Sequence, residues 1–456
     1  MINLTLTELA GILGVDGSAY AGLEFTGVTI DSRKSCEAQL FVALKGVNFD
    51  GHQFVGAAFD NGAVAALVEK PVNSDIPQLV VEDCIQAMGQ MANYWRRLCD
   101  PCVIGLTGSN GKTTVKEMLF QILAGQASTH ATRGNLNNDI GVPLTLFELS
   151  KDHDYAIIEM GANHRGEIAL LADIAEPDIV FINNAAAAHL AGFGDIQGVI
   201  EAKGELYAYC SPKQQALFNA DEAATGYWRS LCAAQTQLTC ALDNDADVGV
   251  DWQTVREGIL VELSYQGETQ VCKLAVMGEH NARNAVAAVA LALLAGVEFN
   301  QAVNNLSGFT GVKGRLQLMS GPSHSCLIND SYNANPGSLV AGIKVLCALD
   351  GAAWLALGDM GELGDEAVEF HRKAVQTARE LGVEKFFGVG DMSCQASSEF
   401  GPAGYCFERV EEMADSILAQ IHPEVNLLVK GSRAAGMERL VDLLTQASRG
   451  GDANAV

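Results

Sequence analysis

Basic residues and long apolar runs are both scarce in this chain of 456 residues, and each scarcity excludes a class of partner. The sequence has 29 Lys and Arg against 55 Asp and Glu, a formal net charge of -26. A field of that sign repels polyanions, so we expect no nucleic-acid partner. The longest run of small apolar residues, 285–297, is shorter than the ~20 residues that cross a bilayer. Residues 1–10 carry neither the basic nor the apolar part of a secretory signal, and we expect a cytoplasmic protein without membrane spans.

Proline is also scarce, with 10 residues against 47 glycines, which predicts many turns and few linkers. The 12 cysteines are spread along the chain and are expected to be reduced, mostly buried small side chains. Cys99 and Cys102 form the one close pair, and the absence of a second pair at zinc spacing disfavours a metal or redox role. At ~150 residues per domain, the length predicts about three domains.

The order of apolar runs and turns divides the chain into α/β segments at 1–100, 101–312 and 313–456. In the first, short strand-like runs alternate with helical stretches, and the Asp100-Pro101 step marks its end because a residue before proline disfavours helix. The middle segment repeats a strand, glycine turn and helix, with strands apolar on both faces as in a buried parallel sheet. The last segment has four apolar runs between helical stretches, at 326–330, 353–358, 385–390 and 426–431. We therefore expect three domains: a small α/β N-terminal domain, a central P-loop ATPase-like parallel sheet and a C-terminal Rossmann-like domain.

The strongest local signal is a glycine-rich turn, GLTGSNGKTT from Gly105 to Thr114, which lies between a predicted strand and a predicted helix at 115–123. Backbone N–H groups of such a turn can surround a triphosphate, while Lys112 neutralises its outer oxygens and the Thr113 hydroxyl reaches Mg²⁺. Leu106 stands where the strict pattern has glycine. A glycine-rich turn with a chance lysine is the alternative, but the strand–turn–helix context favours an ATP site.

Three further side chains are candidates near that turn. Glu159 ends the apolar run 155–160, where a neighbouring parallel strand brings a carboxylate beside the loop and can supply a magnesium ligand. His189 follows the run 179–184 at the same expected sheet edge, although lone histidines are more often structural groups than ligands. Lys203 lies between glutamates on a predicted helix, a pattern that by itself is typical of a solvated charged face.

Several motifs follow the glycine-rich turn in order: GNLNND at 134–139, IEMGANHRGEI at 158–168, AAAAHL at 185–190 and AKGE at 202–205. With them the chain resembles the Mur ligases of peptidoglycan synthesis, over nearly its whole length. Its motifs DSYNANP at 330–336, GDMGELG at 358–364 and LVKGSR at 428–433 are most similar to the members that join D-alanyl-D-alanine to a UDP-N-acetylmuramoyl-tripeptide.

The resemblance implies a role for particular residues of this sequence. It implies that Lys112, His189 and Lys203 are catalytic. It implies two magnesium ions held by Thr113, Glu159, His189 and a carbamylated Lys203. Carbamylation converts a deprotonated lysine into a carboxylate-like ligand. It implies ATP contacts from Thr107, Gly108, Ser109, Asn110, Gly111, Lys112, Thr113, Thr114, Asn281, Asn284, Arg315 and Asp330, with His280 in the adenine-side motif. It implies that the sugar nucleotide and dipeptide meet Ser32, Arg33, Phe41, Lys45, Gly46, His52, Asn135, Asn137, Asn138, Tyr332, Asn333 and Asn335.

The implied reaction is ATP-driven amide synthesis in the cytoplasm by a monomer: the tripeptide carboxylate is phosphorylated to an acyl phosphate, and the dipeptide amine displaces phosphate. The first domain would bind the UDP-sugar-peptide, the second ATP and the third the dipeptide. The sequence departs from the family at Lys313, where relatives carry proline, and at Arg283, an extra cation in the adenine-side motif.

Other functions remain open at this point. A ligase that adds the third amino acid and a folylpolyglutamate synthetase share the glycine-rich turn, but DSYNANP differs from their histidine-containing versions, and the DNPR-type motif of the former is absent. A different class is a nucleotide-driven switch, which would hydrolyse ATP without an acceptor.

Overall fold

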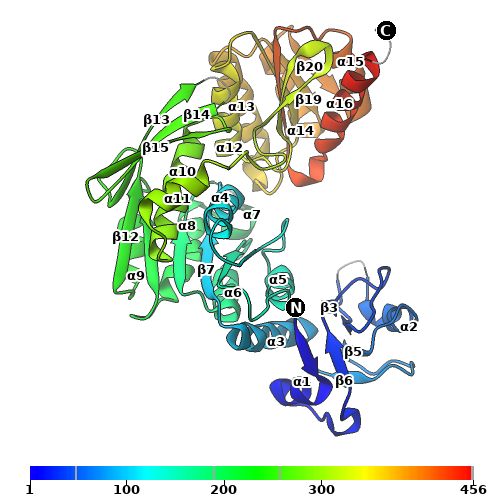
Figure 1. The fold of residues 1–456 in the computed structure, drawn as a ribbon. Coiled ribbons are helices and arrows are strands. Elements are labelled where there is room, and N and C mark those ends of the chain that lie inside the picture. Colours follow the sequence, from blue (N-terminus) through cyan, green and yellow to red (C-terminus); the bar gives the residue numbers. More distant parts are fainter. Residues whose placement is uncertain (47–48, 188–189, 256–257, 453–456) are drawn as a thin grey trace.

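The chain folds into three α/β units in a row, as Figure 1 shows. The computed structural model describes residues 1–46, 49–187, 190–255 and 258–452. The expected α/β class with several parallel sheets is confirmed. Within the described residues, no helix is long and apolar enough to cross a membrane.

The N-terminal unit is built on a parallel sheet of four short strands in the order β3-β4-β5-β6, beside the antiparallel pair β1-β2. These strands are β1 Asn3–Thr5, β2 Glu24–Thr26, β3 Val28–Thr29, β4 Leu40–Val42, β5 Ala65–Val68 and β6 Gln78–Val80. The accompanying helices are α1 Leu6–Leu13, α2 Val55–Asp60 and α3 Cys84–Cys99.

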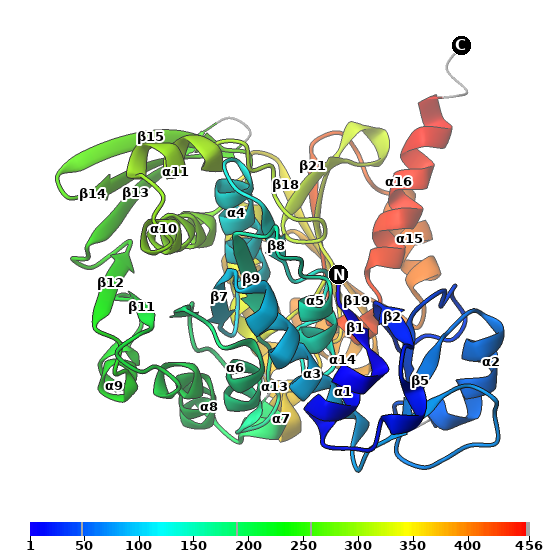
Figure 2. The ribbon, with the colours of Figure 1, turned by 60° about the horizontal axis from the view of Figure 1, so that its bottom comes forward.

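Helix α3 attaches this unit to the central one, and it lies beside α5 and α6 in Figures 1 and 2. Its start is fixed by the Asp83 carboxylate, which accepts from the backbone N–H groups of Ile85 and Gln86. The Trp95 indole donates to the Leu149 carbonyl at 3.1 Å, and the buried Arg96 guanidinium donates to the carbonyl of Ala175 at 3.0 Å. These bonds hold one end of the N-terminal unit on the central unit.

The central unit carries one nine-stranded sheet, in the order β15-β14-β13-β12-β11-β10-β7-β9-β8. Along the chain its strands are β7 Cys102–Thr107, β8 Thr129–Ala131, β9 Tyr155–Glu159, β10 Ile179–Ile182, β11 Gln215–Asn219, β12 Thr236–Ala241, β13 Val248–Val255, β14 Gly258–Tyr265 and β15 Glu268–Leu274. Its helices are α4 Lys112–Ala124, α5 Gly141–Phe147, α6 Glu167–Ala175, α7 Leu190–Phe193, α8 Ile196–Ala208, α9 Thr225–Leu231, α10 Glu279–Leu294 and α11 Phe299–Leu306.

Pairing in this sheet is parallel from β8 to β13, as the apolar runs predicted. Beyond this parallel part, the strands β13, β14 and β15 at the far edge pair antiparallel, an arrangement that the sequence did not predict. Exposed and buried residues alternate along β14, so this edge has one face in solvent.

The C-terminal unit has a six-stranded sheet in the order β16-β17-β21-β18-β19-β20, parallel except for β16. The strands are β16 Gln317–Ser320, β17 Cys326–Asp330, β18 Ala352–Gly358, β19 Lys385–Val389, β20 Gly404–Phe407 and β21 Val425–Lys430. The helices are α12 Pro336–Cys347, α13 Ala367–Glu380, α14 Asp391–Phe400, α15 Val410–Leu418 and α16 Glu438–Asp452. The four predicted runs are strands β17, β18, β19 and β21, whereas β16, α14 and β20 were not predicted.

One pair of cysteines differs from the sequence-based expectation. Cys394 on α14 and Cys406 on β20 form a disulfide, so the expectation that every cysteine is reduced is wrong for these two. They are separated by 12 positions in sequence, and the spacing alone carried no sign of the pairing.

Candidate functional site

The glycine-rich turn connects β7 to α4 at the carboxyl end of the central sheet. Gly111 adopts a left-handed φ of 78° and precedes Lys112, the first residue of α4. A Cβ atom at Gly111 would lie 2.5 Å from both Asn183 Nδ2 and Asn284 Oδ1, so only glycine fits there. The Lys112 ammonium folds back over the turn and donates to the Gly108 carbonyl at 2.6 Å. Burial lowers the pKa of Lys112, which the nearby Glu159 carboxylate opposes.

Two asparagines that the sequence analysis missed hold this turn in shape. The backbone N–H of Ser109 donates to the Asn184 carbonyl at 3.0 Å. The backbone N–H of Asn110 donates to Asn184 Oδ1 at 2.8 Å. Asn183 donates from Nδ2 to the Asn110 carbonyl at 2.9 Å. Both residues follow β10 directly. In the sequence, the signal for them is a pair of asparagines directly after an apolar run, at the sheet edge where the phosphate loop also lies.

Glu159 lies where the parallel pairing predicted it. Its strand β9 pairs with β7, with Glu159 opposite Leu106, and the carboxylate is only 2% exposed. The Thr113 hydroxyl donates to Glu159 Oε2 at 2.9 Å, and Asn137 donates from Nδ2 to Oε1 at 2.9 Å. A hydroxyl and a carboxylate oxygen are the hard ligands that Mg²⁺ takes from proteins, with the remaining positions left to water and phosphate. No cluster of three or more His, Cys, Asp or Glu residues able to hold a metal exists among the described residues, and a Mg²⁺–nucleotide site does not require one.

Lys203 is buried, contrary to the pattern of a solvated helix face. It lies on α8 and is 2% exposed, and it borders the same cavity as Glu159. The flanking glutamates point away from it: Glu201 pairs with Arg165 at 2.7 Å, and Glu205 accepts from the Gly166 backbone N–H at 2.7 Å. Burial, together with the nearby positive charge of Lys112, lowers the pKa of Lys203 well below its ordinary value. His189 lies outside the described residues.

The adenine-side candidates lie on the first turns of α10, behind the glycine-rich turn. Asn284 accepts from Asn183 Nδ2 at 3.2 Å and donates to Asn281 Oδ1 at 3.3 Å, which connects the turn to α10. His280 borders the cavity, and burial lowers its pKa. The extra cation Arg283 is neutralised by three carboxylates, with separations of 2.5 Å to Asp221, 2.6 Å to Asp243 and 2.8 Å to Glu279.

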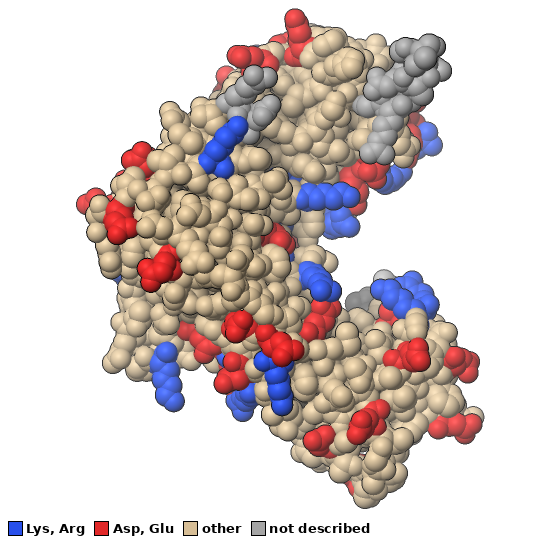
Figure 3. Space-filling view, in the orientation of Figure 1, with Lys and Arg blue, Asp and Glu red and all other residues tan. Residues whose placement is uncertain are grey.

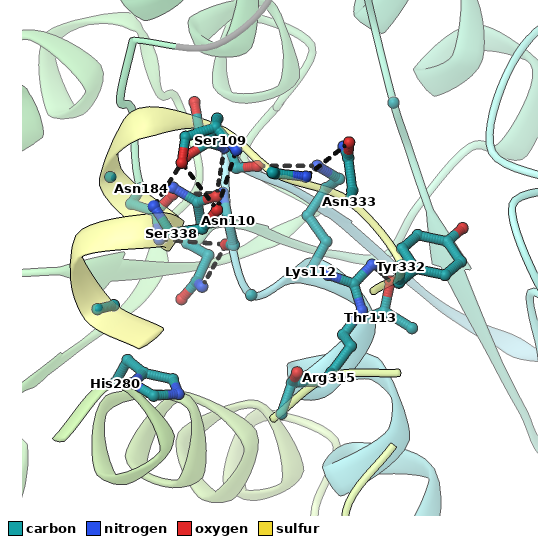
Figure 4. A pocket seen from close by; sticks show the side chains of 18 of the residues that line it. Ser109, Asn110, Lys112, Thr113, Asn184, His280, Arg315, Tyr332, Asn333 and Ser338 are labelled. Carbon is teal, nitrogen blue, oxygen red and sulfur yellow. Dashed lines mark hydrogen bonds between the residues drawn. The ribbon is translucent and has the colours of Figure 1, made fainter. Parts of the chain in front are cut away.

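The C-terminal unit contributes two contacts to the turn. Arg315 donates from a guanidinium nitrogen to the Thr113 hydroxyl at 3.1 Å, and its guanidinium carbon lies 4.3 Å from the centre of the Tyr332 ring (Figure 4). Asn335, which also caps α12, donates from Nδ2 to Asn110 Oδ1 at 2.7 Å. Lys313, where the sequence departs from the family, is exposed and lies two positions before Arg315.

Asp330 is held within the C-terminal unit by Lys430. The buried Lys430 ammonium lies 2.5 Å from Asp330 Oδ2 and donates to the Asn333 carbonyl at 2.9 Å, while the Leu316 backbone N–H donates to Asp330 Oδ1. The Asn333 side chain itself is exposed.

A single cavity of about 950 Å³ brings these groups together, and it is lined from both the central and the C-terminal unit. Most of the ATP and metal candidates border it, as do part of the substrate candidates: Asn135, Asn137, Asn138, Tyr332, Asn333 and Asn335. Thr107 and Gly108 lie directly before this lining, with Thr107 fully buried at the end of β7.

The N-terminal candidates do not line this cavity. Phe41 and His52 are buried in their own unit, where the His52 ring nitrogens meet Asp50 at 2.6 Å and the Glu69 backbone N–H at 2.9 Å. Arg33 is exposed and paired with Asp31, whose pKa it lowers to about 2. Ser32 is buried, whereas Lys45 is exposed and Gly46 half-buried.

Figure 3 shows a hollow between the N-terminal unit and the rest of the molecule, with basic side chains on both of its sides.

Known proteins and protein families match this chain in all three units. Family models match at residues 24–96 (Mur ligase family, catalytic domain), 106–292 (Mur ligase middle domain) and 314–433 (Mur ligase, glutamate ligase domain). The UDP-N-acetylmuramoyl-tripeptide–D-alanyl-D-alanine ligase of Escherichia coli is 37% identical over 98% of this chain and 99% of its own. Among solved structures, MurF from Acinetobacter baumannii matches with a TM-score of 0.91 at 35% identity over 98% of this chain and 99% of its own. MurF from Thermotoga maritima, solved in complex with ADP, matches with a TM-score of 0.81 at 25% identity over 93% and 98%.

Proposed function

This chain belongs to the Mur ligase family, and from that premise we propose that it is an ATP-dependent ligase that joins D-alanyl-D-alanine to UDP-N-acetylmuramoyl-tripeptide. Relatives that match over nearly the full length of this chain carry that activity in their names. One observation supports the proposal above the others: Lys112, Thr113 and Glu159 share a cavity with Arg315 and Asn335 of the C-terminal unit. The loop that can bind a triphosphate therefore faces a second unit, which can bind the amine acceptor in the same cavity.

The chemistry takes two steps. A carboxylate oxygen of the tripeptide attacks the γ-phosphorus of ATP, which releases ADP and forms an acyl phosphate. The dipeptide amine then attacks the acyl carbon, and phosphate leaves as the amide bond forms. Negative charge develops on the phosphoryl oxygens in the first step, where Lys112 and the N–H groups of the turn from Gly108 to Thr113 can stabilise it.

The donor set at Thr113 and Glu159 fits a magnesium ion. When bound there, magnesium supplies positive charge to the phosphoryl oxygens. Lys203 fits the proposed carbamylation because its burial favours the neutral amine, and only the neutral amine captures CO₂. We assign a second magnesium ion to the carbamate together with His189.

We assign the UDP-sugar to the N-terminal unit, with Ser32, Arg33, Lys45, Gly46 and the buried Phe41 and His52 shaping its pocket, and the dipeptide to residues 313–456. The tripeptide end must then cross the hollow to the ATP site, where Asn135, Asn137 and Asn138 can receive it. Closure of the units over the cavity would exclude water, which hydrolyses acyl phosphates. We further propose that the enzyme works as a monomer in the cytoplasm, the compartment of ATP and of nucleotide-linked precursors.

An acceptor panel tests the substrate assignment. Purified enzyme is given ATP and Mg²⁺ with the UDP-tripeptide, a UDP-dipeptide or a folate as the carboxyl donor. The acceptor is D-alanyl-D-alanine, free D-alanine, diaminopimelate or glutamate, and products are identified by mass. Only D-alanyl-D-alanine should be coupled, and only to the UDP-tripeptide. Coupling of diaminopimelate to a UDP-dipeptide, or of glutamate to a folate, would transfer the assignment to one of the sister ligases.

A further inference from the structure

Lys116 is a buried lysine that the proposed chemistry does not use. It lies on α4, one helical turn after Lys112, and its side chain is 1% exposed. The ammonium donates to the backbone carbonyl of Thr132 and lies 2.7 Å from the carboxylate of Glu117. An ammonium loses its hydration on burial and is retained only where strong partners replace the water. The charge therefore fixes the Thr132 carbonyl to the helix that begins with the phosphate loop.

Thr132 in turn fixes the backbone of Glu159. It follows β8 and is 1% exposed, and its backbone N–H donates to the Ile157 carbonyl at 3.0 Å. Its hydroxyl accepts the backbone N–H of Glu159 at 3.0 Å. Lys116 thus reaches the metal-ligand candidate through one intermediate residue.

The same segment also holds the Glu159 side chain. Asn137, five positions after Thr132, donates to Glu159 Oε1, and its own carbonyl accepts the backbone N–H of Gly161 at 2.7 Å. The other oxygen, Oε2, faces the Thr113 hydroxyl on α4. Helix α4 therefore contacts Glu159 in two ways, directly through Thr113 and indirectly through Lys116 and Thr132.

We infer that Lys116, acting through Thr132, is a positioning residue that sets the distance between Thr113 and Glu159 and thereby the affinity of the site for a divalent cation. The inference rests on the proposed function, because it assumes that these two oxygens bind the metal of a metal–nucleotide complex. Partners one step removed from a metal ligand typically change metal affinity by about 10- to 100-fold when they are lost.

The test measures metal affinity directly, without turnover. Mn²⁺ is titrated into the full chain saturated with ADP, and the free ion is followed by electron paramagnetic resonance. Lys116→Met keeps the length of the side chain without its charge, and Thr132→Val removes only the hydroxyl. Thr132→Val should weaken Mn²⁺ binding about tenfold or more, and Lys116→Met should weaken it by a smaller factor, while the affinity for ADP without metal changes less than twofold. Thr132→Ser retains the hydroxyl and should bind Mn²⁺ as the parent chain does.

Lys373→Met is the matched control, since Lys373 on α13 also pairs with a carboxylate, Glu369 at 3.6 Å, but is 64% exposed. It should leave Mn²⁺ affinity unchanged. Folded Lys116→Met and Thr132→Val chains with parental Mn²⁺ affinity would overturn the inference, as would an equal loss of ADP affinity without metal. If Lys116→Met does not fold, the comparison of Mn²⁺ affinity between Thr132→Val and Thr132→Ser tests the inference. A parent chain that binds no Mn²⁺ in the ADP complex would instead overturn the metal site of the proposed function.

Discussion

Replacing Gly111 by alanine perturbs the phosphate loop at the point where its geometry is tightest. The residue has a φ of 78°, and an added Cβ would lie 2.5 Å from both Asn183 Nδ2 and Asn284 Oδ1. Such separations displace the ends of both side chains and disturb the hydrogen bond between them, which measures 3.2 Å.

The expected cost follows from two contributions. Alanine in the left-handed region costs about 1–2 kcal/mol, and the lost hydrogen bond costs about 0.5–1.5 kcal/mol. Together they amount to about 1.5–3.5 kcal/mol against the loop conformation that binds nucleotide. At 1.4 kcal/mol per factor of ten, Gly111→Ala should weaken ADP binding by about 10- to 300-fold.

Gly296→Ala is the control for an alanine placed in the left-handed region outside the phosphate loop. Gly296 has a φ of 88°, but no atom lies within 4 Å of its added Cβ. Calorimetry should show parental ADP affinity for this control, with a lower unfolding temperature in a melting experiment. The reasoning would be refuted if Gly111→Ala bound ADP within threefold of the parent chain, or if Gly296→Ala lost affinity equally.

Four further predictions concern the reaction and the closure of the units. Lys112→Ala should reduce kcat about a thousandfold in a phosphate-release assay, because a preorganised donor to the phosphoryl oxygens is lost, and a near-normal kcat would remove Lys112 from the chemistry. Lys203→Ala should be inactive and partly rescued by short carboxylic acids, which imitate the carbamate; failure of every acid would exclude the modification. In the parent chain, bicarbonate stimulation should grow as pH rises through the lowered pKa of Lys203, since the neutral amine reacts. Small-angle scattering should show compaction when an ATP analogue and the UDP-tripeptide are added together, and an unchanged radius of gyration would contradict closure.

Local patterns predicted the core of the site because its residues lie at the ends of adjacent parallel strands. The turn from Gly105 to Thr114 and the carboxylate of Glu159 come from β7 and β9, which are neighbours in the sheet. The contact between Thr113 and Glu159 followed from that adjacency alone.

Other features of the structure depend on tertiary packing, which local sequence patterns do not predict. Flanking glutamates made Lys203 look solvated, yet Glu201 and Glu205 turn toward Arg165 and the start of α6, which leaves the lysine inside. The antiparallel edge at β13–β15 was overlooked although its residues alternate in polarity. The burial of Lys116 has no counterpart in sequence, where a Lys-Glu pair on a helix is typical of an exposed face.

Phosphate release under matched conditions tests the central claim that the turn from Thr107 to Thr113 passes a phosphoryl group to a carboxylate. The purified enzyme is assayed with ATP and Mg²⁺ alone, with either cosubstrate, and with the UDP-tripeptide and D-alanyl-D-alanine together. The account predicts sustained release only when both are present, with one phosphate for each amide formed. Equal release from ATP alone would contradict it and identify the chain as a nucleotide-driven switch.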